Sequence, residues 1–132
     1  MQTIYQIYCF KVVPNRFKMK KYFCVFLLII FNSCATLTSN TIIKANDSFI
    51  LGNNPHGTFK VKLENVSKNN LEIYHAPIAG GKHSTVIIKP KEKVSLKVDA
   101  NTALFIQNKS NEEASVNLKV TGDLELSMGY QK

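Results

Sequence analysis

The stretch Phe59-Lys60-Val61-Lys62-Leu63-Glu64 alternates apolar and charged residues with a period of two. Successive side chains of a β-strand point to opposite faces, so this pattern predicts a strand with one face in a core and one face in water. The same alternation occurs in four other stretches, which are residues 71–74, 94–98, 116–120 and 124–128. Residues 85–88 and 103–107 are apolar almost throughout, which is typical of central strands covered on both faces.

Turn-forming residues separate these stretches at intervals of roughly 10 to 15 residues, as in antiparallel sandwiches and barrels. Examples are Gly52-Asn53-Asn54-Pro55 and Lys89-Pro90-Lys91. After Phe31 no window of about 11 residues has the 3.6-residue period of a helix. The sequence therefore predicts an all-β fold, a small antiparallel β-sandwich of about seven or eight strands, with immunoglobulin-like and jelly-roll-like connectivity both open.

The predicted sandwich occupies residues 47–132 and is a single domain. Residues 34–46, which precede it, are rich in Thr, Ser and Asn, and only Ile42 and Ile43 interrupt this polar composition. Such a composition is typical of flexible connections. We therefore expect residues 34–46 to be a flexible tether in front of the domain.

An export leader precedes the tether, in residues 1–33. Residues 22–31 form an apolar run of ten, which is about half of the length that a helix needs to cross a bilayer. The charged residues Lys18, Lys20 and Lys21 come directly before it, as in the charged and apolar regions of a signal peptide. A translation start at Met19 would give this leader the usual proportions.

The leader ends in Phe31-Asn32-Ser33-Cys34. This segment resembles the type II signal peptides of bacterial lipoproteins, in which a small residue precedes an invariant cysteine. The resemblance implies that the thiol of Cys34 receives a diacylglyceryl group, that the leader is cut off before Cys34, and that the lipid holds the protein to a membrane. It implies a place in the bacterial cell envelope, at the outer membrane in lipoproteins of the Bacteroidetes type.

Two other interpretations of the leader remain open. Small residues at Ser33, Ala35 and Thr36 would also suit an ordinary signal peptidase, which leaves no lipid. An uncleaved anchor would need the ten-residue apolar run to be stretched across the bilayer. Two acyl chains, by contrast, anchor a protein stably without any transmembrane helix.

The net charge of +8 is concentrated in the leader, which holds five of the 17 basic residues. From Cys34 onward there are 12 lysines against 9 acidic residues and no arginine, hence a net charge of +3. Arginine is the residue best suited to phosphate and base contacts, so we expect no nucleic-acid partner. We interpret the lysines as a solvated surface and as protection of sheet edges. The three cysteines are Cys9, Cys24 and Cys34, so the exported part has no disulfide.

Residues 74–84 are the best candidate for a binding site. This segment gathers Tyr74, His75, Lys82 and His83 around the pair Gly80-Gly81, and we expect it to be an exposed loop. The alternative is that it is only a long hairpin connection that binds no ligand. It is not a phosphate-binding loop, because a strand follows it where that motif needs a helix. The expected partners are an envelope protein or a glycan, bound by a monomeric domain.

Metal binding and catalysis have weaker support in the sequence. His75 and His83 could share a metal ion, with His56 as a third ligand, so a carrier of a metal ion or another soluble ligand is the alternative function. A spacing of eight residues specifies no metal site, however, and no Cys or Asp lies close to either histidine in the sequence. No serine stands in a nucleophile elbow, and no paired carboxylates suggest acid–base chemistry. We therefore expect no metal, no cofactor and no enzymatic activity.

Overall fold

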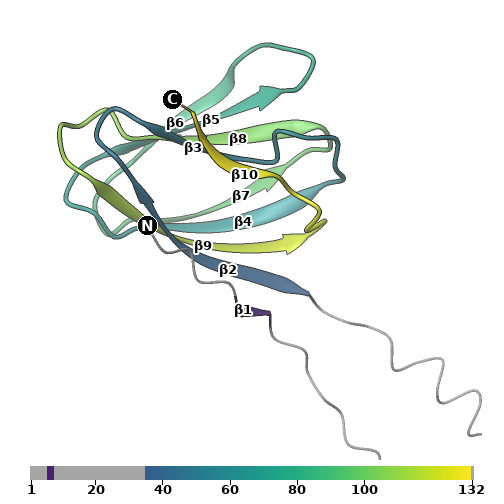
Figure 1. Ribbon diagram of the computed structural model, residues 1–132, viewed down its shortest axis with the longest axis horizontal. Helices are drawn as coiled ribbons and strands as arrows, with labels where there is room; N and C mark the ends of the chain where they lie inside the picture. Colours follow the sequence, from purple (N-terminus) through teal and green to yellow (C-terminus); the bar gives the residue numbers. More distant parts are fainter. Residues whose placement is uncertain (1–5, 8–34, 132) are drawn as a thin grey trace, which may run out of the picture.

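The computed structural model describes residues 6–7 and 35–131 of the chain, and they form two β-sheets packed face to face (Figure 1). Within these residues there is no helix, and hence none long and apolar enough to cross a membrane. The predicted all-β sandwich is thus confirmed. The predicted leader, except for residues 6–7, and Cys34 lie outside the described residues.

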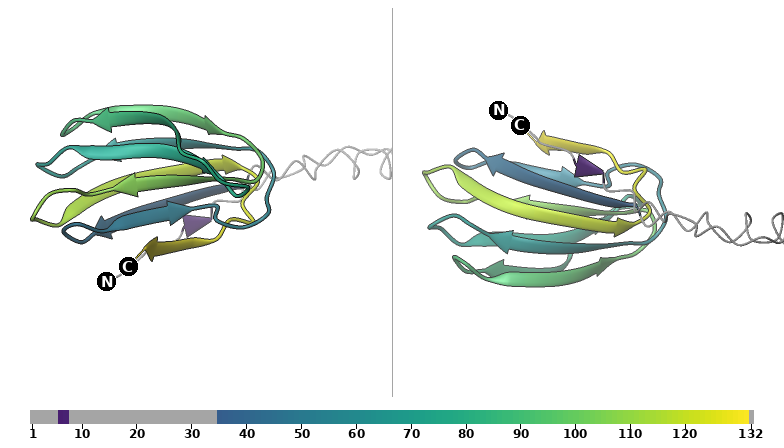
Figure 2. Two further views of the ribbon diagram at one scale, coloured as in Figure 1. Left: turned by 90° about the horizontal axis from the view of Figure 1, so that it is seen from above. Right: turned by 90° about the horizontal axis from the view of Figure 1, so that it is seen from below.

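Ten strands make up the two antiparallel sheets. They are β1 (Gln6–Ile7), β2 (Thr36–Ile43), β3 (Ser48–Leu51), β4 (Phe59–Asn65), β5 (Leu71–Pro77), β6 (His83–Ile88), β7 (Lys93–Val98), β8 (Thr102–Gln107), β9 (Ala114–Gly122) and β10 (Met128–Gln131). Sheet A has the order β1-β2-β9-β4-β7, and sheet B has the order β10-β3-β8-β5-β6. The view from above shows sheet B, and the view from below shows sheet A (Figure 2).

The strand pairing is nested, and this decides the connectivity. The strands β2, β3, β4 and β5 pair in turn with β9, β8, β7 and β6, as if one long hairpin had been folded over on itself. Eight strands that alternate between two sheets in this way form a jelly roll rather than an immunoglobulin-like sandwich. Strand β10 extends sheet B beside β3, and the two-residue β1 pairs with β2, so the strand count exceeds the predicted number.

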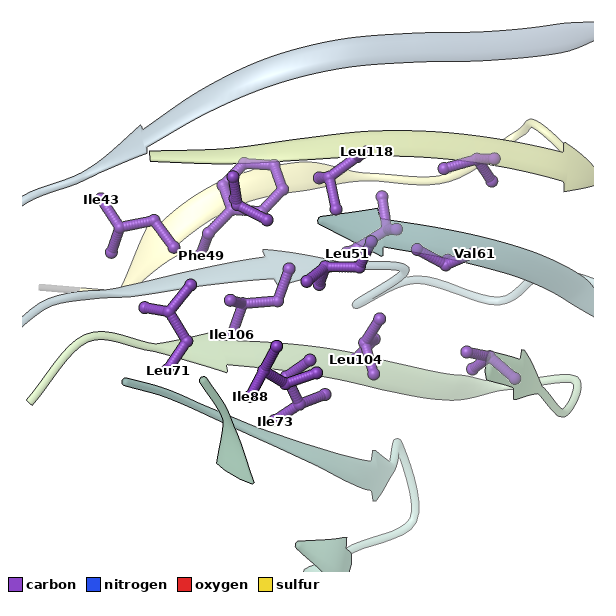
Figure 3. Close-up of a cluster of buried hydrophobic side chains, with 14 of the residues drawn as sticks. Ile43, Phe49, Leu51, Val61, Leu71, Ile73, Ile88, Leu104, Ile106 and Leu118 are labelled. Carbon is purple, nitrogen blue, oxygen red and sulfur yellow. The ribbon is translucent and has the colours of Figure 1, made fainter. Parts of the chain in front are cut away.

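The alternating stretches place their apolar residues in the core between the sheets (Figure 3). In β4 the side chains of Phe59, Val61 and Leu63 are at most 1% exposed, whereas Lys60 and Lys62 face water. Strands β8 and β9 supply Leu104, Ile106, Val116, Leu118 and Val120 to the same core. Burial of these side chains is the main favourable term in the folding of the domain.

The predicted tether is wrong, because the domain begins at Thr36 rather than at residue 47. Residues 36–43 form strand β2, which pairs along its whole length with β9. Its inward-facing residues Ser39 and Thr41 are buried, and their hydroxyl groups hydrogen-bond each other at 3.0 Å. The mutual hydrogen bond lets these two polar residues occupy core positions of the strand. Because the inner positions are polar, the composition of the strand resembles that of a linker.

Two predicted strands differ in the structure. Residues 85–88 were expected at the centre of a sheet, but β6 is the edge strand of sheet B and Ile87 is 59% exposed. In the stretch 124–128 the strand begins only at Met128. Leu124 and Leu126 nevertheless pack against the core. The alternation of apolar and polar residues in this stretch therefore reflects which side chains are buried, although the stretch is not part of a sheet.

The sandwich has two different ends. The chain enters β2 at one of them, the entry end, where the loops 52–58, 78–82, 99–101 and 123–127 also lie. At the opposite end two buried asparagines, Asn65 and Asn108, organise turns of the same design. In each, the amide nitrogen donates to the carbonyl four residues on, and the amide oxygen accepts from the serine two residues on. The second turn contacts the first through Asn69, whose amide donates to the hydroxyl of Ser110.

Candidate functional site

The predicted binding loop is largely strand. Strand β5 continues to Pro77 because Ala76 and Pro77 pair with β8, and β6 begins at His83, so only residues 78–82 form a turn. Gly80 and Gly81 have φ angles of +113° and +103°, which other residues rarely adopt. The hairpin reaches beyond the body of the sandwich at the upper right of Figure 1. The prediction of a long exposed loop is therefore corrected to a hairpin with a short tip.

A compact polar and aromatic group, the Tyr74 cluster, covers the outer face of sheet B. It consists of Glu72, Tyr74, Lys82, Phe105 and Lys109. The rings of Tyr74 and Phe105 stack with their centroids 4.8 Å apart and their planes 8° from parallel. The Nζ atom of Lys82 lies 4.0 Å from the centroid of the Tyr74 ring, within range of a cation–π interaction. Two of the four predicted site residues, Tyr74 and Lys82, are thus brought together.

Glu72 ties the cluster together electrostatically. Its carboxylate accepts a hydrogen bond from Lys109 at 2.6 Å and one from Lys82 at 3.0 Å. These bonds, the one from Lys109 first, lower the pKa of Glu72. Both lysines are largely exposed, so the pairs contribute little to stability but hold the two ammonium groups at defined places beside the aromatic rings.

His75 points away from the Tyr74 cluster. It lies on the core face of sheet B, in register with Leu104 of β8 and opposite His83 of β6. Its Nε2 atom is buried and has no hydrogen-bond partner among the described residues. Burial lowers the pKa of His75, and the nearby carboxylate of Asp99 opposes this effect. His83 itself is exposed at the start of β6.

The histidines do not complete a metal centre in the part of the chain that the structure describes. Within residues 6–7 and 35–131 no group of three or more His, Cys, Asp and Glu side chains is placed to hold a metal ion. His75 and His83 supply only two imidazoles, where a protein site needs three or four ligands. The ring nitrogens of His56 contact the carbonyl oxygens of Gly57 and Thr102, at 2.5 and 3.0 Å, so this side chain connects loops of the entry end.

We predict that His75 makes stability depend on pH. Because the pKa of His75 is lowered in the fold, the unfolded chain binds a proton at a higher pH than the folded domain does. The contribution of His75 to stability is therefore complete above about pH 6.5, the pKa in the unfolded chain, and is lost as the pH falls below that value. Melting temperatures measured from pH 8 to pH 5 should fall less in His75→Leu than in the wild type. His83→Gln is the control. Because His83 is exposed, this variant should show the same pH dependence of the melting temperature as the wild type. An unchanged pH dependence in His75→Leu would contradict the prediction.

Sequence reasoning missed three members of the Tyr74 cluster. Phe105 lies in a stretch for which the sequence predicts cover on both faces. The adjacent residues Leu104 and Ile106 are buried, whereas Phe105 points to the opposite, outer face. Glu72 and Lys109 stand 37 positions apart, so nothing local connected them. The only available signal was that Glu72 and Tyr74 occupy the outward positions of an alternating stretch, beside each other on one face.

Two shallow depressions on the described surface lie away from the Tyr74 cluster. One, of about 380 Å³, lies at the opposite end between the asparagine turns and is lined by Ile42 and Val66 with Glu112 and Glu113. The other, of about 440 Å³, lies on the outer face of sheet A, where Lys62, Lys93 and Lys119 line it together with Thr38, Ser95 and Asn117. Glu64 also lines the second depression, so a ligand there would meet lysines, hydroxyl groups, an amide and one carboxylate that Lys93 already engages.

Comparison with known proteins identifies no family. No family model matches the chain, and no curated protein matches it. Among solved structures it is similar to the capsular polysaccharide assembling protein CapF from Staphylococcus aureus and to CapF with the inhibitor 3-isopropenyl-tropolone, with a TM-score of 0.49 and 14% identity in each. The match covers 67% of this chain and only 28% of those chains. The class of the domain, a jelly-roll β-sandwich, therefore rests on its own strand order.

Proposed function

We propose that the protein is a lipoprotein of the bacterial cell envelope, cut before Cys34 and held at the outer membrane by lipid on that cysteine. The observation that carries the proposal is the position of this cysteine. It ends the predicted leader with its charged and apolar regions, and strand β2 begins two residues later, at Thr36. Cleavage before Cys34 would thus remove only β1 and leave β2–β10 intact.

The short connection would place the domain directly at the membrane. Two residues of extended chain span roughly 7 Å, so the entry end of the sandwich would lie next to the lipid surface. The loops at that end, including the tip of the β5–β6 hairpin, would face the bilayer. The opposite end, with its asparagine turns, would face away from it.

We propose that the domain binds a partner rather than catalyses a reaction. The charged groups of the Tyr74 cluster are engaged with one another, so this cluster is suited to present a fixed surface and not to transfer protons. Residues 35–131 contain no arginine, which favours an envelope protein or a glycan over a nucleic acid as the partner. A monomeric sandwich whose outer faces carry charged and aromatic side chains fits such a role.

Lipidation is tested by metabolic labelling with palmitate in a bacterial host. We expect the wild type to carry the label and Cys34→Ala to carry none, because only the thiol of residue 34 receives the diacylglyceryl group. The variant Cys24→Ala is the matched control and should keep the label, since that cysteine is removed with the leader. Label on Cys34→Ala, or a mature protein that begins at another residue, would contradict the proposal.

A further inference from the structure

The outer face of sheet A carries an array of lysines that the structure leaves unpaired. We call this array the lysine face and define it by Lys60, Lys62, Lys97 and Lys119, all exposed. The strand register places Lys62 directly opposite Lys119, and Lys60 directly opposite Lys97. Two pairs of like charges thus lie side by side on neighbouring strands.

No acidic residue neutralises these four lysines in the part of the chain that the structure describes. Glu64 is the single acidic residue that faces outward from this sheet, and it is engaged by Lys93 at 3.6 Å and by the amide of Asn117 at 3.4 Å. The other ion pairs of the described residues belong to Glu72 on sheet B. None of the four lysines of the lysine face therefore forms an ion pair among the described residues.

This arrangement costs stability, and protection of sheet edges does not explain it. Like charges directly opposite each other on neighbouring strands destabilise a sheet. Lysine protects edge strands from pairing with other chains, but β4 and β9 lie inside sheet A and are paired on both sides. The expectation that lysines serve the sheet edges thus fails for Lys60, Lys62 and Lys119.

The chemistry around the lysines indicates what neutralises them. The 440 Å³ depression borders Lys62 and Lys119 and adds the hydroxyl groups of Thr38 and Ser95. Glu64 lines it too, but its carboxylate is engaged by Lys93 and Asn117. Thr121 stands next to Lys60 in the register. Ammonium groups match carboxylates or sulfates, and hydroxyl groups match the hydroxyls of a sugar. No aromatic residue faces outward from β2, β9, β4 or β7, so this surface lacks the side chains typical of a protein interface.

We propose that the lysine face binds an acidic polysaccharide, a chain of sugars that carries a carboxylate or sulfate at regular intervals. Such a polymer would lie along the shallow depression with its acidic groups on the two lysine pairs and its hydroxyls on Thr38, Thr121 and Ser95. This inference names the partner class for the proposed envelope role and rests on the domain being a binding module. It does not depend on the lipid anchor.

The test uses the full chain, purified in a nonionic detergent and held on a sensor by a tag at its C-terminus. Polygalacturonate is the acidic probe, and dextran of equal length is the neutral one. The face variant combines Lys60→Gln, Lys62→Gln and Lys119→Gln. The control variant combines Lys44→Gln, Lys68→Gln and Lys89→Gln, which are exposed lysines outside the lysine face, so that both variants lose the same charge.

We expect the wild type to bind polygalacturonate and not dextran, and the face variant to lose affinity by roughly 10- to 100-fold. The control variant should lose less than about threefold, because it changes only the general charge of the protein. The face variant should also melt at a temperature equal to that of the wild type or a few degrees higher, since it removes like-charge pairs. A merely structural role of the lysines would lower the melting temperature instead.

Several results would overturn the inference. No binding of polygalacturonate, an equal loss in both variants, or equal binding of dextran would each exclude a specific acidic-sugar site. Micelles that contain phosphatidylglycerol are tested in addition as competitors of polygalacturonate. If they displace polygalacturonate and themselves depend on Lys62 and Lys119, the face recognises lipid headgroups and not a polysaccharide. Because this assay needs no anchor, its failure is distinct from the loss of palmitate labelling that would disprove lipidation.

Discussion

We expect Phe59→Asp to abolish the folded state of the domain. Phe59 is 1% exposed at the entry end of the core, and its ring packs edge-on against the ring of His56, with centroids 5.1 Å apart. An aspartate there would bury an unpaired charge and leave a cavity, at a cost of about 5 kcal/mol or more. That cost is comparable to the whole stability of a small domain, which is about 5 to 15 kcal/mol. Circular dichroism should show neither a β-sheet spectrum nor a cooperative melting transition.

The neighbouring residue provides the control. Lys60 lies on the same strand with its side chain in water, opposite Lys97, so Lys60→Asp would replace a like-charge pair with an opposite-charge pair. We expect Lys60→Asp to fold and to melt within a few degrees of the wild type, or slightly above it. Equal tolerance of aspartate at positions 59 and 60 would contradict the observed burial pattern of β4.

The second large effect is expected at Asn108, which is completely buried at the opposite end. Its amide nitrogen donates to the carbonyl oxygens of Ile43, Lys44 and Glu112, and its amide oxygen accepts from the backbone nitrogen and the hydroxyl of Ser110. Asn108→Ala would leave several of these buried groups unpaired, which costs about 3 kcal/mol. For a domain of this size the melting temperature should fall by roughly 10 to 20 °C.

Two variants make this prediction specific. Asn108→Asp keeps the shape of the side chain but replaces its donor with a second acceptor that faces three carbonyl oxygens, so it should destabilise the domain at least as much as alanine. Asn111 lies in the same turn and is exposed, so Asn111→Ala should change the melting temperature by only a degree or two. Equal effects of the alanine substitutions at positions 108 and 111 would show that Asn108 does not organise this turn.

The strands of the sandwich could be predicted where buried and exposed residues alternate within a single stretch of sequence. Phe59, Val61 and Leu63 alternate with Lys60 and Lys62, and this pattern alone identified the strand and its inner face. Strand β2 was missed because Ser39 and Thr41 occupy its inner positions, where polar residues are stable only once they hydrogen-bond each other beneath a partner strand. The edge position of β6 could not be inferred from its apolar residues either, because it depends on how all the strands of sheet B are ordered.

The candidate site could be predicted only in part, for the same reason. Tyr74 and Lys82 are joined by a hairpin, and their proximity followed from the sequence. The ring of Phe105 reaches Tyr74 through the pairing of β5 with β8, which no local pattern reveals. Likewise, the alternating stretches 59–64 and 116–120 predicted lysines facing water, but only the register of β4 with β9 places Lys62 opposite Lys119.

The nested pairing of the strands also determines when the domain can fold. The first residue of β2, Thr36, pairs with Thr121 of β9, 85 positions later in the chain. Contacts between such distant segments close large loops, and domains dominated by them fold slowly, on a scale of milliseconds to seconds. Strand β2 is made early but lacks its partner until β9 has been synthesised. Sheet A can therefore form only after residue 122 has been synthesised, and until then the edges of β2 and β4 are open to other partners.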